Sequence, residues 1–456
     1  MDPFFIKALQ LILSLSILIV LHELGHFIPA KIFKTRVEKF FLFFDVKFAL
    51  FKKKIGGTVY GIGWLPLGGY VKIAGMIDES MDKEQMAQPP QPWEFRSKPA
   101  WQRLIIMLGG VTVNIVLGFL IYMMVLFVWG SPYITPEDLP NGFAVDDTFK
   151  EMGFQDGDKV IKVDGEELKN TIDINKYLML RDVNNVTVQH PDGKKETISI
   201  PEDIGSTMFQ QGVMLPFVPM EYPILDSITA DSPAERAGLQ KGDRIIAVND
   251  TEIGYWHELT RQVKASQDEE LRLVIQREGE FESMELDGEG KKLLAGGMKT
   301  IKITPDEEGK LGVYPKITRL NIRHEKYSLG ESVVKGFDLA YWTLHDYVAQ
   351  FKYVFTKKGA TQVGGFGAIG GLFPDQWNWQ AFWMTTAFIS IILAFMNILP
   401  IPALDGGHVM FLLYEMISGR KPNEKFMEYA QLVGFFLLIA LVLFANGNDI
   451  YRWLFE

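Results

Sequence analysis

The chain has 456 residues, no cysteine and a formal net charge of −10. The absence of cysteine excludes disulfides, thiolate metal ligands and a cysteine nucleophile, and the acidic balance argues against nucleic-acid binding, which needs a basic face. The length suggests two to four structural units, and a hydrophobic content of 48% is high for a soluble protein with this many charges.

The first apolar run, about residues 4–30, contains the sequence His22-Glu23-Leu24-Gly25-His26. On a helix this spacing places two imidazoles one turn apart on the same face, where both can bind one zinc ion. The glutamate between them lies beside the metal and can take a proton from a bound water. Because ionisable side chains inside a membrane-length apolar helix are rare without a functional reason, the run predicts a metalloprotease that works within the membrane.

A signal peptide is the competing interpretation of this run. The apolar stretch is too long for one, and no small-residue cleavage site follows it. Cleavage there would also discard both histidines, so we interpret the run as a membrane-spanning helix.

Glycine, β-branched and aromatic residues alternate through the segment from Gly56 to Ile73. This composition predicts hairpins rather than a helix. One interpretation is a re-entrant β-structure next to the zinc, whose edge strand receives an extended substrate, since non-helical backbone at membrane depth is tolerated where it lines a cavity. The alternative is an ordinary cytoplasmic hairpin. Under the first interpretation, the substrate-binding candidates are Gly61, Gly63, Gly68, Gly69 and Tyr70.

Three further stretches are long and apolar enough to span a bilayer, at about 103–129, 380–400 and 427–445. Basic residues outnumber acidic ones in residues 31–102, whereas residues 131–375 are rich in Asp and Glu. The positive-inside rule then predicts a cytoplasmic 31–102 loop, with the 131–375 region and both termini outside. This arrangement fits a bacterial inner membrane protein with its zinc motif toward the cytoplasmic half.

Residues 131–305 contain an internal repeat, because the sequence Gly153–Val163 recurs in similar form as Gly238–Val248. Each copy predicts a helix end at glycine, a turn and a short strand. The second copy, with Ala237-Gly238-Leu239 before Gly242-Asp243, resembles PDZ domains of bacterial proteases, and the first copy is a weaker match. PDZ domains bind extended peptides by adding a strand to a sheet edge. The alternative is that one or both copies act only as spacers or size filters with an occluded groove.

A helical stripe follows the repeat, with apolar residues at steps of four and three. Its members are Leu329, Val333, Phe337, Ala340, Leu344, Val348, Phe351 and Phe355. Ala340 is its weakest member because its side chain is small. The stripe favours a helix that lies on the outer membrane face near the active-site entrance, and a helix packed on the repeat pair is the alternative.

A third zinc ligand is needed beside the two histidines and an open water position. The third apolar stretch is broken by Pro400 and Pro402, and a new helix is predicted to begin near Gly406. Asp405 is the favoured ligand at this break, although an N-cap role would also explain it. His408 is the alternative, since imidazole also suits zinc.

The motifs together resemble the site-2 protease family of intramembrane zinc metalloproteases, in particular its bacterial regulator of sigma-E protease type with tandem PDZ domains. The resemblance is carried by the His22–His26 motif, the Pro66–Lys72 hairpin, the Trp101-x-Arg103 entry to the second span with Asn114, and the Asn397–Gly406 segment. It assigns zinc to His22, His26 and Asp405, assigns the general base to Glu23, and places Asn397 beside the substrate. Gly110-Val111 and Gly365-Phe366 depart from the Gly-Pro pairs usual in the family, which affects local backbone rather than chemistry.

The expected fold is therefore a polytopic α-helical membrane protein with four transmembrane helices, a membrane-associated β-hairpin region and two inserted α+β PDZ domains. The predicted segments are residues 1–33 (first span), 34–75 (β-hairpin region), 76–130 (linker and second span), 131–220 and 221–305 (PDZ domains), 306–375 (amphipathic helical region), 376–426 (third span and Asp405 turn) and 427–456 (fourth span and tail).

The resemblance implies a Zn²⁺ cofactor, contact with the lipid bilayer and substrates that are transmembrane segments of single-span proteins, such as anti-sigma factors or signal peptide remnants. Two other classes are kept as alternatives. One is a transporter with a structural zinc site, since transporters also hold charges and broken helices near mid-membrane. The other is a membrane scaffold built on PDZ domains.

Overall fold

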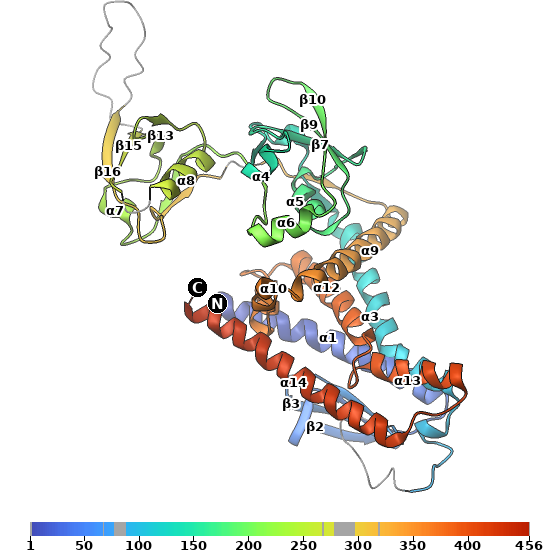
Figure 1. The fold of residues 1–456 in the computed structure, drawn as a ribbon. Helices are drawn as coiled ribbons and strands as arrows, with labels where there is room; N and C mark the ends of the chain where they lie inside the picture. The colour runs from blue at the N-terminus through green and yellow to red at the C-terminus, as the bar shows by residue number, and fades with distance from the viewer. Residues whose placement is uncertain are drawn as a thin grey trace, which may run out of the picture. The chain divides into compact units, whose positions relative to one another are not determined.

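The computed structural model describes residues 2–66, 68–76, 88–266, 269–277, 297–317 and 320–455. The chain divides into two compact units, one formed by Met1–Ser131 with Glu325–Glu456 and the other by Pro132–His324 (Figure 1). Some residues used in the sequence interpretation lie outside the described ranges, namely Leu67 of the predicted hairpin and the loop charges Asp78, Glu79, Asp82, Lys83 and Glu84.

Within the described ranges, four helices are long and apolar enough to cross a membrane, as the sequence predicts. They are α1 (Pro3–Ile32), α3 (Ala100–Trp129), α12 (Trp379–Ile398) and α14 (Glu424–Phe455). The last helix runs to Phe455 rather than ending near Ala445. Its polar residues do not end the helix because they bind a neighbouring segment instead: Asn446 Oδ1 accepts from the Phe366 N–H, and Asp449 Oδ2 accepts from the Ala368 N–H.

Helix α3 is the central helix of the first unit, in contact with α1, α12, α9 (Leu329–Val354) and α13 (Asp405–Ser418) (Figure 1). Its closest approach is to α1, where a Cβ on Gly25 would overlap the Gly109 carbonyl and a Cβ on Gly109 would overlap the Gly25 carbonyl. Small residues of this kind let two membrane helices pack backbone to backbone.

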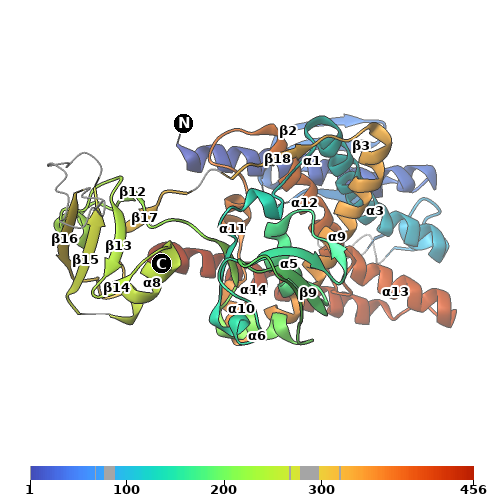
Figure 2. The same cartoon turned by 90° about the horizontal axis from the view of Figure 1, so that it is seen from above.

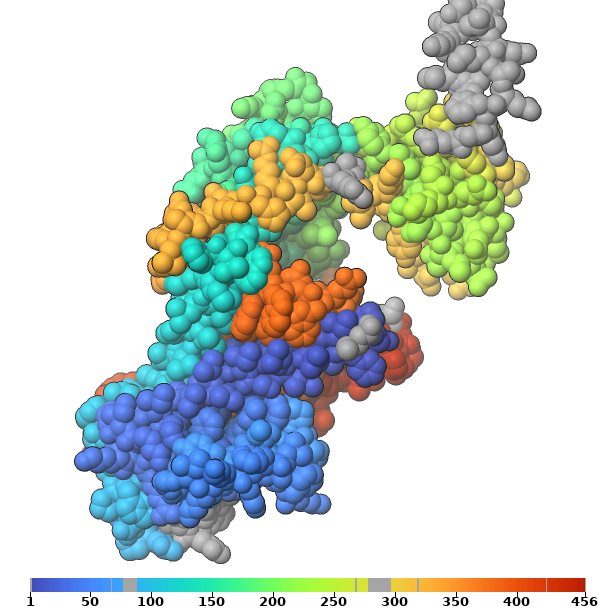
Figure 3. Space-filling view, turned by 180° about the vertical axis from the view of Figure 1, so that it is seen from behind, coloured from blue at the N-terminus to red at the C-terminus, as the bar shows by residue number. Residues whose placement is uncertain are grey.

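A four-stranded sheet lies against α1, and its residues appear in lighter blue beside the darker α1 in Figure 3. It contains β1 (Val37–Leu42), β2 (Phe44–Ile55), β3 (Thr58–Leu65) and β4 (Tyr70–Ile73) in the order β2-β3-β1-β4. The predicted hairpin is confirmed at β2–β3, where Gly56 and Gly57 both have positive φ. The parallel pairing of β1 with β3 was not predicted, and it leaves β4 at one edge of the sheet.

The second unit contains two copies of one arrangement. One sheet has the order β10-β9-β7-β8, and the other has the order β14-β13-β15-β16, which is the same arrangement read from the opposite edge. In Figure 2, α8 lies beside β13 and β14 of the second copy. The elements are β5 (Ser131–Tyr133), β6 (Phe143–Val145), α4 (Asp147–Lys150), β7 (Lys159–Val163), β8 (Glu166–Glu167), α5 (Ile174–Leu180), β9 (Asn185–Gln189), β10 (Lys195–Ser199), α6 (Ile204–Gln211), β11 (Phe217–Pro219), β12 (Leu225–Ile228), α7 (Pro233–Arg236), β13 (Arg244–Val248), β14 (Thr251–Glu252), α8 (Trp256–Ala265), β15 (Leu271–Gln276), β16 (Met298–Ile303), β17 (Val313–Pro315) and β18 (Arg323–Glu325).

The repeated Gly-Asp pair has the same structural role in both copies. Asp158 and Asp243 are fully buried just before β7 and β13. Each carboxylate contacts the side chain of the residue just after the neighbouring strand: His190 Nδ1 lies 2.6 Å from Asp158, and Arg277 Nε lies 2.6 Å from Asp243. The second copy extends past the predicted boundary at residue 305, because β17 pairs with β12 and Leu311 lies in the copy's core.

The apolar stripe after the repeat lies on α9, and its bulky members are largely exposed, so their place on the membrane face stays a prediction. Ser332, Gly336 and Ala340 are buried, whereas the bulky Val333 and Phe337 are exposed. The reason is close helix packing, because a Cβ on Gly336 would overlap Met123 of α3. Ala340, the weakest member of the apolar stripe, is therefore at the centre of the contact. The short helices α10 (Lys357–Gln362) and α11 (Phe366–Gly371) follow.

Asp138 joins the first and last parts of the second unit. Its carboxylate accepts from Thr135 Oγ1 at 2.7 Å, Arg323 Nε at 2.8 Å and Asn321 Nδ2 at 3.0 Å. These bonds, led by the one from Thr135, lower the pKa of Asp138 from 3.8 to about 2.

Asp138→Asn is expected to destabilise the second unit at pH 7. A carboxyl with a depressed pKa stabilises the fold above its unfolded value, and this stabilisation is lost as pH falls from about 4 toward 2. The difference between variant and wild type, measured by proteolysis of the repeat region in the full-length protein, should therefore shrink below pH 4. Asp182→Asn, at an exposed position, serves as the control. A difference that stays constant with pH would contradict this account.

Candidate metal centre

Two elements bring three metal-binding side chains together. His22 and His26 are one turn apart on α1, and Asp405 is the first residue of α13. The turn between α12 and α13 is tight, with Ala403 at positive φ and no room for a Cβ on Gly406 beside the carbonyls of residues 398 and 399. An ion pair of 2.5 Å between Arg103 of α3 and Glu415 holds α13 against the central helix. The break between α12 and α13 thereby places Asp405 next to His22 and His26.

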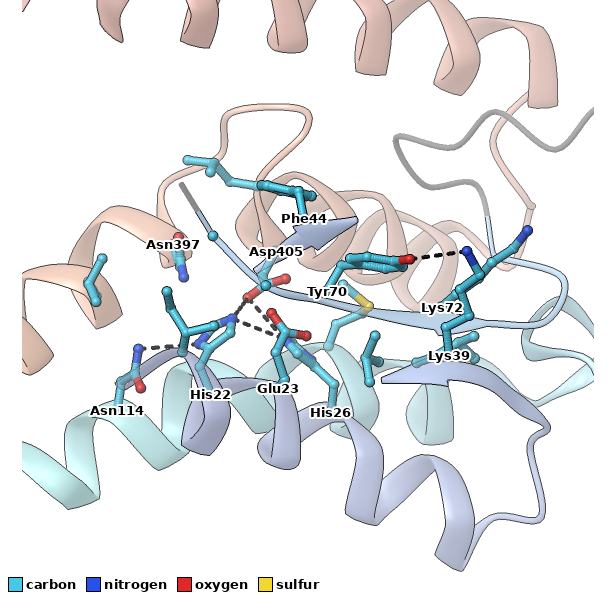
Figure 4. A pocket seen from close by; sticks show the side chains of 18 of the residues that line it. His22, Glu23, His26, Lys39, Phe44, Tyr70, Lys72, Asn114, Asn397 and Asp405 are labelled. Atoms are coloured by element: carbon cyan, nitrogen blue, oxygen red, sulfur yellow. Dashed lines mark hydrogen bonds and ion pairs between the residues drawn. The ribbon is translucent and has the colours of Figure 1, made fainter. Parts of the chain in front are cut away.

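The ligand atoms have the spacing of a metal site. His22 Nε2 and His26 Nε2 lie 3.3 Å and 3.4 Å from Asp405 Oδ2, and 3.2 Å from each other (Figure 4). Ligands at 2.0–2.1 Å around a tetrahedral zinc ion are about 3.3 Å apart. Asp405 Oδ2 is buried and has no hydrogen-bond partner in the described structure beyond these two imidazoles. The three side chains therefore fit a zinc ion with one open position.

The other nitrogen of each imidazole contacts α3, which sequence reasoning missed. His26 Nδ1 lies 2.8 Å from the Ile106 carbonyl, and His22 Nδ1 lies 3.2 Å from the Asn114 amide (Figure 4). The close approach needs Gly110, where a Cβ would overlap the His26 ring. The sequence does contain one indication of this contact. Gly25 in the first predicted span and Gly109-Gly110 in the second are small residues that allow two neighbouring helices to pack closely.

An open cavity of about 610 Å³ surrounds the three ligands. Glu23 points into it beside His26 (Figure 4), and Val71 of β4 lines the same cavity. Asn397 of α12 lines the same cavity (Figure 4). His408 does not join this group, since its Nε2 lies 2.7 Å from Gln431 Nε2 on α14.

The predicted substrate-binding glycines separate into two sets. Gly68, Gly69 and Tyr70 line the cavity at the start of the edge strand β4. Gly61 and Gly63 do not, and their prediction as part of a free edge is wrong, because β3 lies between β2 and β1. These two glycines instead make room for packing, since a Cβ on either would overlap Phe41 or Phe44.

Tyr70 is held rigidly at the cavity wall. Its ring stacks on Phe41 and Phe44 with centroid distances of 5.5 Å and 6.1 Å. Its hydroxyl donates to Asp45 at 2.8 Å and accepts from Lys39 Nζ at 3.2 Å. The wall facing the metal ligands is thus an ordered strand rather than a loose loop.

Comparison with known protein families identifies the family of this chain. A model of peptidase family M50 matches residues 10–441. The chain belongs to peptidase family M50. Among its relatives, the regulator of sigma E protease of Haemophilus influenzae is 26% identical over 97% of this chain and 98% of its own length. RseP of Escherichia coli K12 and a putative zinc metalloprotease of Vibrio cholerae are each 27% identical, over 97% of both chains.

The site-2 protease resemblance is thereby confirmed. As an M50 peptidase, the chain is an intramembrane zinc metalloendopeptidase of regulated proteolysis, and zinc is its cofactor. Together with the four apolar helices, the relatives indicate an inner-membrane protein. The transporter and scaffold alternatives are not favoured.

Gly25→Ala is expected to separate α1 from α3 and to lower both stability and zinc content. The added Cβ meets backbone rather than a movable side chain, and overpacking of this kind costs about 1–3 kcal/mol. Zinc per mole of protein and thermal unfolding in detergent measure the two effects. Gly447→Ala on α14 is the matched control, because no heavy atom lies within 4 Å of its Cβ position. Equal zinc content in both variants would contradict the packing argument.

Proposed function

We propose that His22, His26 and Asp405 hold the zinc ion of this protease and that Glu23 is its general base. The observation that carries the proposal is the triangle of ligand atoms, with sides of 3.2–3.4 Å, around a buried carboxylate oxygen that lacks any other partner. Glu23 opens onto the same cavity. A transporter would not need a general base beside a three-ligand metal site.

The chemistry follows from these positions. Held by His22, His26 and Asp405, a zinc ion would polarise the scissile carbonyl and make water a stronger nucleophile. Glu23 takes the water proton and delivers it to the leaving amine. Asn397, on the cavity wall, donates a hydrogen bond to the oxygen on which negative charge develops.

We further propose that the substrate is a transmembrane segment of a single-span protein, such as an anti-sigma factor or a signal peptide remnant. A peptide bond in a helix is shielded by its own turn, so the segment must unwind and its freed backbone groups need partners. The outer edge of β4, beginning at Gly68, Gly69 and Tyr70, supports this role because it borders the cavity beside Glu23. Strand addition to this edge satisfies the unwound backbone.

We propose that the two copies of the second unit are PDZ domains, bounded near 131–220 and from 221 to about 317. Their common strand order and paired buried aspartates support a shared fold. The excess of basic residues in 31–102 supports a periplasmic second unit and an active site toward the cytoplasmic half. On the periplasmic side, the two PDZ domains would exclude substrates whose outer domain is still bulky.

Glu23→Gln is expected to abolish cleavage while leaving zinc bound. Loss of a positioned general base reduces rate by about 10²–10⁴-fold, and the amide keeps the size of the side chain. Cleavage of a reporter transmembrane segment and zinc content are measured on the same purified protein. The exposed Glu307→Gln is the control and should cleave normally. Wild-type cleavage by Glu23→Gln would overturn the proposed mechanism.

Helix stability in the substrate is expected to set the rate of cleavage. Gly or Pro placed near the middle of a reporter span lowers the cost of unwinding, since each destabilises a helix by about 1–3 kcal/mol. Such a reporter should be cleaved faster than one of equal length with Ala at the same position. If the two reporters were cleaved at equal rates, unwinding onto β4 would not limit the reaction.

A further inference from the structure

Asn114 lies in the middle of α3 and is 1% exposed. Its side-chain nitrogen is 3.2 Å from His22 Nδ1 (Figure 4). Its other amide atom, Oδ1, is buried without a hydrogen-bond partner in the described structure. Among the described residues, His22 is therefore the contact that fixes which end of the amide faces the ring.

The proton on His22 decides this orientation. His22 Nε2 faces Asp405 Oδ2 and His26 Nε2, so it must present a lone pair to bind a cation. A neutral imidazole with a free Nε2 carries its proton on Nδ1. That N–H needs an acceptor, and only the amide oxygen of Asn114 can accept. The two amide orientations occupy the same space, so Oδ1 turns toward His22 when the metal binds.

His26 shows the same arrangement with a different acceptor. Its Nδ1 lies 2.8 Å from the Ile106 carbonyl, which can only accept. Ile106 and Asn114 are about two turns apart on one helix. Helix α3 therefore offers one acceptor to each imidazole, a carbonyl to His26 and a side-chain amide to His22.

We propose that Asn114 is a positioning residue that fixes the tautomer and ring orientation of His22 for zinc. The inference rests on the proposed assignment of zinc to His22, His26 and Asp405. Partners of this kind on metal-binding histidines contribute about 10–100-fold in metal affinity. Asn114 acts through His22 and needs no contact with the substrate.

The structure supplies a matched control at the same residue. The backbone carbonyl of Asn114 accepts from Ser390 Oγ at 2.7 Å, which ties α3 to α12. Ser390→Ala removes this bond without touching His22, so it measures the effect of loosening the helices. Asn114→Asp keeps an oxygen acceptor at the same place, whereas Asn114→Ala removes it.

The test measures zinc affinity of the full-length protein in detergent by competition with a chelator. Asn114→Ala should bind zinc about 10–100-fold more weakly than wild type, while Asn114→Asp and Ser390→Ala stay close to it. The d–d spectrum of the Co²⁺-loaded protein should change in Asn114→Ala alone. Wild-type affinity in Asn114→Ala, or equal weakening in Asn114→Asp, would overturn the inference.

His22→Ala distinguishes this failure from failure of the proposed function. If His22→Ala loses zinc while Asn114→Ala retains it, the ligand assignment stands and the role of Asn114 is wrong. If His22→Ala also binds zinc like wild type, the ligand assignment itself is wrong and the role of Asn114 falls with it.

Discussion

The backbone contact between α1 and α3 is the constraint on which the metal centre depends. At Gly25 and Gly109 the two helices approach so closely that neither position accepts a Cβ. Apolar packing between helices gains little inside a bilayer, so close van der Waals contact and hydrogen bonds must hold the helices together. This approach places Gly110 against the imidazoles and brings the Ile106 carbonyl and Asn114 within hydrogen-bond distance of His26 and His22. A wider crossing would take away the partners that α3 offers to the two histidines.

Buried polar groups of the first unit also hold its helices together. Thr386 donates to Ser14, Ser390 donates to the Asn114 carbonyl, and Arg103 pairs with Glu415, so these polar side chains find partners across a helix interface. Gln10 Oε1, Thr35 Oγ1 and Asn114 Oδ1 are buried without a hydrogen-bond partner in the described structure, but they are uncharged. Asp405 Oδ2 is the charged exception, and the two imidazoles face it. A buried carboxylate oxygen without a donor is costly unless a cation takes that place. The exception therefore marks the function of the site.

Sequence alone predicted the four spans from local hydrophobicity and the His22–His26 pair from its fixed spacing. It left Asp405 and His408 as alternatives for the third ligand, and the family resemblance assigned Asp405. Sequence did not predict contacts that depend on three-dimensional packing. The parallel pairing of β1 with β3 joins strands separated by all of β2, and it turned Gly61 and Gly63 from edge residues into interior ones. Hydrophobic periodicity predicted the bulky stripe of α9 but not the small residues Ser332, Gly336 and Ala340, which are buried on the face toward α3. Asn114 carried no chemical signal of its own until α3 was placed beside α1.

The sheet order also determines how many edges a substrate can reach beside the metal ligands. With the order β2-β3-β1-β4, one edge belongs to β2 and the other to β4. The whole of β4 and the two glycines before it, Gly68 and Gly69, line the cavity, whereas the other edge strand, β2, contributes Phe44 and Asp45 at its start. Gly69 allows this approach, because a Cβ there would lie 2.5 Å from Ile19 Cγ2 on α1. A strand added to this edge would run past Glu23, the proposed general base. The glycine that lets the sheet reach α1 would then also set the distance between the bound backbone and that carboxylate.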